Sequence, residues 1–325
     1  MYSESSYMNS FISYIKKKEH PKVSIHIYIF KTTNLVNSGI EYSNSSVSSQ
    51  TNMRKILILC VSLKESLDRQ EKIKKQLVTL NENIQGIQIE FSFFDAVYGK
   101  KLQPEYLTFL NISRQIANQC EHELGPSELG CFLSHMIIWQ RLAQGDYNQY
   151  DRVIIIEDDV ILDFKNIYQK LNSLLKENPE FAFLGGHSEP SRRRIRGYVS
   201  KDQQFFYMTG PKDLYTATYA YSLTPKVAKE FVYKQIKKLT YIDDWKYLLS
   251  GSISTPFYYC FEHDDEQISH IANDRKNFMK KPNRFKKNFN KIKNDTISRL
   301  ISLFVFKKII RLADFLKTQK SSKKI

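Results

Sequence analysis

An apolar, β-branched run leads directly into three carboxylates at residues 153–159. Val153–Ile156 has the length and composition of a strand buried on both faces, as in a parallel α/β sheet. Glu157, Asp158 and Asp159 follow at once, and three acids cannot belong to the same core. Ligand sites of open α/β sheets lie at the carboxyl ends of strands. Because alternate side chains of an extended chain share a face, we expect Glu157 and Asp159 to point one way and Asp158 the other.

Two carboxylates on one face supply the hard oxygen ligands that Mg²⁺ or Mn²⁺ prefers, for example when the ion carries a diphosphate. An ordinary acidic turn after a strand is the alternative. Three acids in a row after so apolar a strand favour the metal site. We therefore predict that Glu157 and Asp159 bind a divalent metal.

The excess of positive charge is confined to the end of the chain. The 325 residues carry a formal net charge of +15, and residues 275–325 contain 17 Lys and Arg against two acids. The rest of the chain is therefore neutral, whereas a globally basic nucleic-acid-binding fold spreads its charge over the body. This distribution argues against nucleic acid as a partner, and binding of nucleic acid through the basic tail alone is kept as an alternative.

Residues 297–317 mix apolar and basic side chains. The apolar ones are Leu300, Leu303, Phe304, Ile310 and Phe315. We predict a basic amphipathic helix on an anionic membrane surface, which makes 275–325 a membrane-associating tail. A C-terminal helix packed on the body is the alternative. No segment approaches the roughly 20 apolar residues of a membrane-spanning helix, and the Ser- and Asn-rich opening lacks the pattern of a signal peptide.

The four cysteines are scattered without a C-x-x-C pair, at positions 60, 120, 131 and 260. This usage fits a reducing compartment and argues against a disulfide framework and against a zinc site. Residues 1–52 are expected to be a poorly ordered extension, or to precede the true start at Met53.

Strand and helix patterns alternate from Lys55 onward. The predicted strands are 56–63, 87–93, 153–156, 181–184 and 214–223, and helices are predicted after Ser66, from Ser127 to Gly145 and after Thr224-Pro225. This alternation predicts an α/β fold with a mainly parallel sheet flanked by helices, over residues 53–274.

Four segments together resemble glycosyltransferase family 25, which includes lipooligosaccharide galactosyltransferases and collagen-modifying relatives. They are Ser66-Leu-Asp68-Arg69, Phe94-Asp95-Ala96-Val97, Leu124–His135 with its Gly-x-x-Glu-x-Gly-Cys-x-x-Ser-His pattern, and Ile156–Val160. The resemblance extends over about Lys55–Ile271, and its central segment is highly specific. Ser62 stands where the family has Asn, which weakens any contact made through that amide.

The resemblance implies a GT-A-like fold, a UDP-sugar donor and inversion at the anomeric carbon. Glu157 and Asp159 would hold the metal and diphosphate, with Mn²⁺ or Mg²⁺ as cofactor, and Asp158 would lie nearer the ribose or sugar hydroxyls. Inverting transfer needs a base for the acceptor hydroxyl, and Asp243 and Asp244 are the candidates. Their alternative role is to cap the helix that starts at Trp245. Rival bases are Asp264, Asp265 and Glu189.

The resemblance also marks donor-binding residues. They are Asp68, Arg69, Asp95, Glu128, Ser134, His135 and Asp158. Without it, Glu128 is an acid favoured in the first turn of a helix, and His135 is a hydrogen-bonded core residue. His187 is a further candidate for the acceptor. The run Ser191–Gly197 is predicted to be a mobile basic loop that attracts a phosphorylated acceptor, or simply a solvated charge run.

These expectations describe a peripheral enzyme on the cytoplasmic face of a bacterial inner membrane. It would move a hexose, galactose from UDP-galactose, to a lipid-linked lipooligosaccharide core. A metal-dependent nucleotidyltransferase also presents paired carboxylates, but no Gly-rich phosphate loop follows the first strand.

Overall fold

The computed structural model describes residues 53–82, 84, 86–102, 124–186, 189–209, 212–215, 218–251, 254–264 and 310–321. The predicted extension 1–52 and most of the predicted tail lie outside these residues. The described strands are β1 (Arg54–Ser62), β2 (Ile87–Asp95), β3 (Arg152–Glu157), β4 (Val160–Leu162), β5 (Phe181–Gly185), β6 (Arg196–Val199), β7 (Phe206–Thr209), β8 (Ala220–Leu223), β9 (Ser254–His263) and β10 (Ile310–Arg311).

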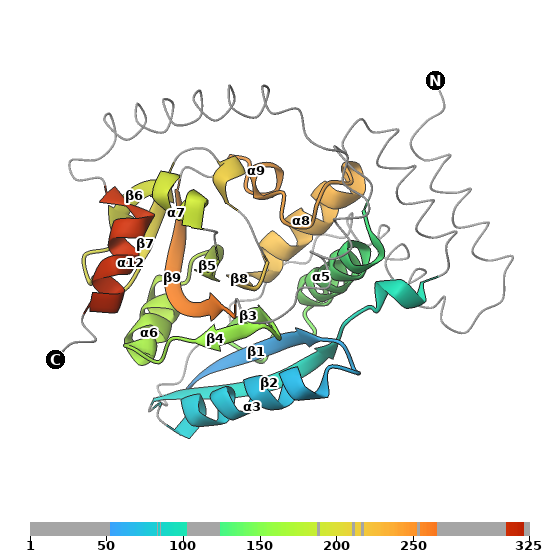
Figure 1. The fold of residues 1–325 in the computed structure, drawn as a ribbon, viewed down its shortest axis with the longest axis horizontal. Helices are drawn as coiled ribbons and strands as arrows, with labels where there is room; N and C mark the ends of the chain where they lie inside the picture. The colour runs from blue at the N-terminus through green and yellow to red at the C-terminus, as the bar shows by residue number, and fades with distance from the viewer. Residues whose placement is uncertain are drawn as a thin grey trace, which may run out of the picture. The chain divides into compact units, whose positions relative to one another are not determined.

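Helices cover both faces of the sheet (Figure 1). They are α3 (Leu67–Glu82), α5 (Pro126–Gln144), α6 (Ile167–Glu177), α7 (Glu189–Arg194), α8 (Pro225–Lys237), α9 (Trp245–Leu248) and α12 (Leu312–Ser321), with 3₁₀ turns η3 (Gly99–Lys101) and η4 (Lys212–Leu214). Several local predictions are confirmed: α3 buries Ile73, Leu77 and Leu80 as its one apolar face, and Thr224 caps α8 ahead of Pro225.

The ten described strands form one mixed sheet in the order β10-β6-β7-β9-β5-β8-β3-β1-β2, with β4 paired to β9. Pairing is parallel for β1 with β2, β1 with β3 and β5 with β9, and antiparallel for every other described pair. The prediction of a mainly parallel sheet is therefore wrong. The short Ser200–Phe205 connection allows only a hairpin between β6 and β7, and β8 runs antiparallel between β3 and β5.

The predicted burial of β3 on both faces is confirmed. Val153 and Ile155 pack with α5 and α8 on one side of the sheet, while Ile154 and Ile156 pack with α3 and α6 on the other. All four side chains are 4% exposed or less. Because both faces of β3 are covered, water reaches only the ends of the strand. The acidic residues that follow Ile156 therefore lie at the edge of the sheet.

The C-terminal residues 310–321 pack on the body. β10 pairs antiparallel with β6, and Leu312, Phe315 and Leu316 of α12 are buried. The Phe315 ring stacks on Phe206 with 5.5 Å between ring centroids. For Phe315 the structure thus supports the packed helix, not the membrane face. Within the part of the chain that is described, every helix is too short or too polar to cross a bilayer.

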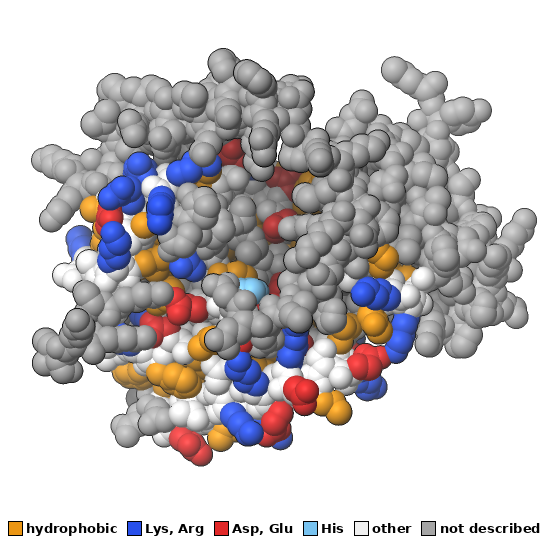
Figure 2. Space-filling model, viewed as in Figure 1, with side chains coloured by type: hydrophobic (Ala, Val, Ile, Leu, Met, Phe, Trp, Pro, Cys, Tyr) orange, Lys and Arg blue, Asp and Glu red, His pale blue; other side chains and the backbone are white. Residues whose placement is uncertain are grey.

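The basic run predicted to be a mobile loop forms the end of α7 and the start of β6. Its helical geometry places Arg192, Arg193 and Arg194 in one turn. Figure 2 shows Lys and Arg side chains gathered over the region of α7, β6 and α12.

Candidate active site

The three acids lie where β3 ends, but not in the expected alternation. β3 stops at Glu157, and Asp158 and Asp159 form a turn that leads into β4. The alternation of an extended chain therefore does not extend past Glu157, and each carboxylate has its own partners. All three line a cleft together with the end of β1, residues 96–99 and the first turns of α5.

Glu157 is bound to residues from two other elements. Thr218 donates a hydrogen bond from its hydroxyl to Oε1 at 2.5 Å, and Nε2 of His135 lies 3.4 Å from the same oxygen. Burial raises the pKa of Glu157, but the His135 and Thr218 contacts outweigh this effect, so the pKa lies below its ordinary value. Glu157 is therefore a carboxylate at neutral pH.

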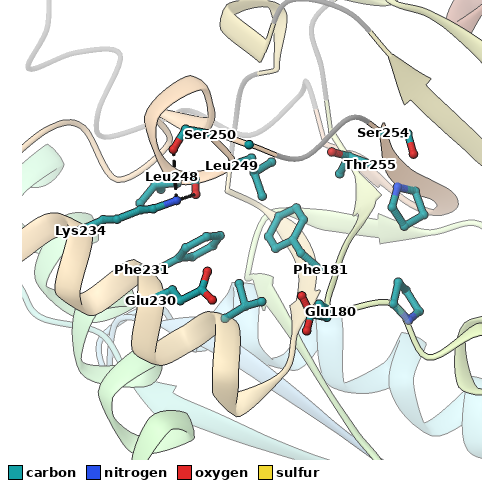
Figure 3. A pocket seen from close by; sticks show the side chains of 14 residues that line it. Glu180, Phe181, Glu230, Phe231, Lys234, Leu248, Leu249, Ser250, Ser254 and Thr255 are labelled. Carbon is teal, nitrogen blue, oxygen red and sulfur yellow. Dashed lines mark hydrogen bonds between the residues drawn. The ribbon is translucent and has the colours of Figure 1, made fainter. Parts of the chain in front are cut away.

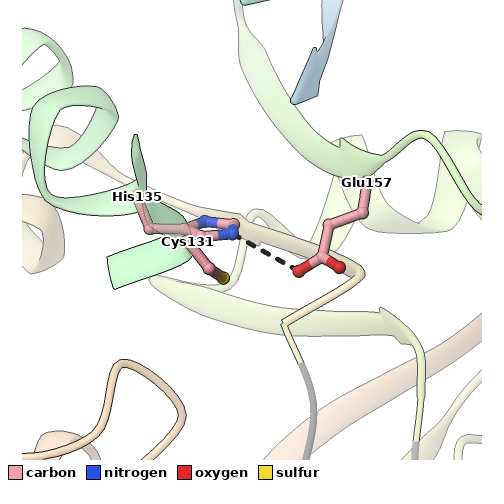
Figure 4. Close-up of side chains that lie close together, drawn as sticks. All are labelled: Cys131, His135 and Glu157. Carbon is pink, nitrogen blue, oxygen red and sulfur yellow. Dashed lines mark ion pairs between the residues drawn. The ribbon is translucent and has the colours of Figure 1, made fainter. Parts of the chain in front are cut away.

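His135 is fully buried between Glu157 and a hydrogen-bond chain. Its Nδ1 lies 2.7 Å from the Tyr221 hydroxyl, which accepts a hydrogen bond from Nε1 of Trp139 at 2.8 Å. These contacts leave Nε2 facing Glu157. Cys131, one turn earlier on α5, completes a group whose thiol, imidazole and carboxylate atoms lie within 4.8 Å of one another (Figure 4).

Asp158 is held inside the protein. Ser62 donates to Oδ2 at 2.6 Å, and Arg69 donates from its guanidinium to Oδ1 at 3.1 Å. Burial nevertheless raises the pKa of Asp158. The serine at position 62 thus makes a direct contact with the acidic turn, and Arg69 reaches the site from α3.

Asp159 has a carboxylate oxygen without a donor. Oδ1 is buried and makes no hydrogen bond to any described residue, while Oδ2 lies 3.4 Å from Nε2 of His263. A buried carboxylate oxygen without a donor is costly in a folded protein. A hard divalent cation is the ligand that satisfies such an oxygen, so Asp159, with Glu157 nearby, fits the predicted metal.

Three other predicted donor residues lie away from the cleft. Asp68 is exposed in the first turn of α3, and Asp95 is an exposed partner of Lys64. Glu128 accepts a hydrogen bond from the Gly125 backbone at 3.2 Å, as a capping acid does. These three acids do not line the cleft.

Ser134 lines the cleft but has both its hydrogen-bonding roles engaged. Its hydroxyl donates to the Gly130 carbonyl at 2.7 Å and accepts from the Val97 backbone at 2.8 Å. Ser134 therefore fixes residues 96–99 against α5. The backbone of residues 97–99 also packs closely on Gly130. A Cβ on Gly130 would lie 2.4 Å from the Val97 carbonyl oxygen and 2.8 Å from the Gly99 nitrogen.

The Asp243–Asp244 pair divides into two roles. Asp244 caps α9 by accepting a hydrogen bond from the Tyr247 backbone at 3.2 Å, which is the alternative that the sequence left open. The charge of Asp243, by contrast, helps to raise the pKa of the Cys131 thiol, after burial and Glu157. Asp243 is thus close enough to Cys131 for its charge to act on the thiol, although it does not itself line the cleft.

The other candidate bases either have partners in the structure or lie outside the described residues. Asp264 is buried and paired with Lys72, and its backbone donates to the Asp159 carbonyl at 2.9 Å. Asp265, His187 and the side chain of Glu189 lie outside the described residues.

Sequence reasoning missed four residues that build the site: Cys131, Thr218, Tyr221 and His263. The spacing of Cys131 and His135, four apart on a predicted helix, was a usable signal for a shared face. Thr218, Tyr221 and His263 come from segments distant in sequence, so no local pattern could connect them to Glu157 and Asp159.

A second cavity of about 480 Å³ lies between α8, α9 and the starts of β5 and β9 (Figure 3). Its Lys234 is committed to the end of α9, since it donates to the Leu248 carbonyl at 2.6 Å and to Ser250 at 3.2 Å. The cavity lies at the edge of the sheet opposite the acidic turn. The clustered carboxylates make the cleft at the end of β3 the candidate active site.

A cleft with clustered carboxylates at the carboxyl end of a central strand is the usual place of a ligand site in an α/β protein. The chain belongs to glycosyltransferase family 25: the family model described as "Glycosyltransferase family 25 (LPS biosynthesis protein)" matches residues 53–246. The resemblance inferred from the motifs is confirmed, and the fold of this family member is mixed α/β.

Two of its relatives are named for different products, procollagen and lipooligosaccharide. Procollagen galactosyltransferase 1-B of Xenopus laevis is 30% identical over 130 residues, which are 39% of this chain and 19% of that one. Lipooligosaccharide biosynthesis protein lic2B of Haemophilus influenzae is 34% identical over 102 residues, 31% of this chain and 33% of that one. The chain thus spans about a fifth to a third of these two relatives.

A viral relative matches over a longer stretch. Putative glycosyltransferase R655 of Acanthamoeba polyphaga mimivirus is 25% identical over 174 residues, 53% of this chain and 46% of that one. Among solved structures, mannose-1-phosphate geranyltransferase of Thermus thermophilus aligns with a TM-score of 0.29 and 8% identity, over 64% of this chain and 74% of that one.

Proposed function

We propose that this enzyme transfers galactose from UDP-galactose to a lipooligosaccharide core with inversion at the anomeric carbon, in a GT-A-like fold. The observation that carries the proposal is the buried Oδ1 of Asp159, which has no donor among the described residues, beside Glu157 at the end of β3 in a family 25 chain. The names of relatives support the sugar and the acceptor class: two relatives are named as a procollagen galactosyltransferase and a lipooligosaccharide biosynthesis protein.

The acidic turn would bind the donor. Asp159 and Glu157 would hold Mg²⁺ or Mn²⁺, which when bound offsets the negative charge on the departing UDP. Asp158, fixed by Ser62 and Arg69, would accept a hydrogen bond from a ribose or sugar hydroxyl. The guanidinium of Arg69 keeps this carboxylate in place while the donor enters the cleft.

Asp243 would act as the base. In a single displacement, the acceptor oxygen forms a bond to the anomeric carbon as the bond from that carbon to the diphosphate oxygen breaks. The acceptor hydroxyl loses its proton to Asp243, and the bonding electrons leave with UDP. The electrostatic effect of Asp243 on Cys131 supports its position near the acidic turn, whereas Asp244 is committed to α9.

Residues 275–309 carry most of the excess positive charge of the chain. This basic segment would hold the enzyme at the anionic cytoplasmic face of the inner membrane, beside its lipid-linked acceptor. Truncation at residue 275 is a poor test of this role, because it also removes the buried side chains of α12. Replacement of Lys and Arg by Gln within 275–309 tests membrane binding and keeps α12.

The decisive experiment is to incubate the full chain with a panel of UDP-sugars and Mn²⁺ and to measure release of UDP. We expect turnover of UDP-galactose above the other donors. Asp243→Asn should lower kcat by about 10²–10⁴-fold. Asp244→Asn is the matched control, because Asn caps a helix as well as Asp and should preserve turnover. Equal activity of the Asp243→Asn variant and the parent would refute Asp243 as the base, and turnover of no UDP-sugar would refute the donor class.

A further inference from the structure

We propose that Cys131, His135 and Glu157 form a second cation site, for a borderline-soft divalent ion such as Zn²⁺. This site differs in its donor set from the oxygen-ligated ion of the proposed function. The absence of a C-x-x-C pair argued against zinc at the level of sequence, but the fold brings the third ligand from a distant strand. Three protein ligands with an open fourth position are a known arrangement for zinc.

The ligand atoms converge from two elements. Cys131 and His135 share one face of α5 because they are four residues apart, and Glu157 approaches from the end of β3 (Figure 4). Nε2 of His135 and Oε1 of Glu157 are 3.4 Å apart. Two such ligands on a tetrahedral ion, each bonded at about 2.0–2.2 Å, are separated by about 3.4 Å. The imidazole and carboxylate thus already have the spacing that an ion between them requires.

The environment of His135 also suits a metal ligand. Its ring is fully buried, and Nε2 points into the cluster, where the Glu157 oxygen at 3.4 Å is too poorly placed to count as a hydrogen bond. The opposite nitrogen, Nδ1, is held by the Tyr221 hydroxyl. Metal-binding histidines are oriented by such a hydrogen bond to the other ring nitrogen. Tyr221 has one donor and two acceptor positions, so it can serve His135 with or without an ion.

The surroundings favour a cation. The carboxylates of Glu157, Asp243 and Asp159 lie close enough to the Cys131 sulfur to act on it electrostatically. They make the cluster a region of negative potential, which Nε2 of His135 faces across the 3.4 Å to Glu157. Binding of the ion displaces the thiol proton to solvent and forms a sulfur–metal bond, with no change of oxidation state.

The shared Glu157 couples this site to the donor site. An ion bound by Cys131 and His135 withdraws Glu157 from the diphosphate-binding cation, so Zn²⁺ should inhibit transfer in the presence of Mn²⁺. This consequence rests on the proposed function, whereas binding of the ion itself does not.

Co²⁺ is the probe, since it replaces Zn²⁺ and gives a thiolate-to-metal charge-transfer absorption when a cysteine is a ligand. The full chain is titrated with Co²⁺ alone, without sugar nucleotide, and then with Zn²⁺. We expect a charge-transfer band that saturates at one Co²⁺ per chain and is abolished by Zn²⁺. Cys131→Ser should remove the band and weaken Zn²⁺ binding at least tenfold.

The matched control is Cys120→Ser, which removes the thiol that lies outside the described residues and should leave the band intact. Glu157→Gln should weaken binding while the sulfur band persists at higher Co²⁺ concentration. A band that survives in Cys131→Ser, or no band in the parent at millimolar Co²⁺, would overturn the proposal. Because no donor is present, a positive spectrum with an enzyme that turns over no UDP-sugar would refute the proposed function and leave the cation site standing.

Discussion

The buried hydroxyl of Tyr221 should stabilise the fold by satisfying two partners at once. Tyr221→Phe keeps the ring, which packs against Trp245 and Phe181, and removes only the oxygen. It deprives Nε1 of Trp139 and Nδ1 of His135 of hydrogen bonds of 2.8 and 2.7 Å. Both partner side chains are fully buried, so water cannot replace the lost oxygen.

A buried polar group left without a partner costs about 1–3 kcal/mol. Two such groups therefore predict a loss of roughly 2–6 kcal/mol in the free energy of unfolding. Urea denaturation followed by circular dichroism measures this loss, and Tm should fall by about 2–4 °C for each kcal/mol.

Tyr258→Phe is the matched control. The Tyr258 hydroxyl is also buried, which raises its pKa, but it makes no hydrogen bond to any described residue. Its removal should change the free energy of unfolding by less than about 1 kcal/mol. If the two variants lose the same stability, the reasoning is wrong, because the effect would then come from the tyrosine ring and not from the Trp139–Tyr221–His135 chain.

Three further changes test other parts of the site. Gly130→Ala places a Cβ 2.4 Å from the Val97 carbonyl oxygen, so urea denaturation should show a loss of about 1–3 kcal/mol. Glu157 has a folded pKa below its ordinary 4.5, so its contribution to stability is present above pH 4.5 and is lost as pH falls through the folded pKa. The stability difference between the parent and Glu157→Gln should therefore shrink on acidification, and a difference that grows would contradict this sign. Asp159→Asn should abolish Mn²⁺-dependent UDP release while its unfolding free energy stays within about 1 kcal/mol of the parent's, because Oδ1 has no described partner to lose; a large loss of stability would mean that the carboxylate is structural.

Local patterns predicted the elements that bear the site. The β-branched run Val153–Ile156 indicated a strand buried on both faces, and the apolar spacing of α3 indicated its buried side. Such patterns are readable because a strand or helix repeats its burial every two or about 3.6 residues. The three acidic residues were recognised because they end this apolar run abruptly.

The roles of those acids were less predictable. The sequence treated Asp243 and Asp244 as equivalent, and only the fold separates the α9 cap from the residue near Cys131. Likewise, the chain turns after Glu157, so the expected sharing of one face by Glu157 and Asp159 does not follow from strand geometry. Both outcomes depend on where the chain bends and on which distant segments then lie beside it, and the local sequence pattern did not predict either.

The sequence by itself determined the family, the central buried strand and the carboxylates at its end. Tertiary structure alone decided the mixed direction of the sheet and the individual environment of each carboxylate. Asp158 meets Ser62 and Arg69, Glu157 meets Thr218 and His135, and one oxygen of Asp159 has no described donor. The physical reason is the separation of these residues along the chain. Periodic burial can be read from neighbouring residues, whereas these contacts join residues about 20 to 100 positions apart and do not change the local hydrophobic pattern.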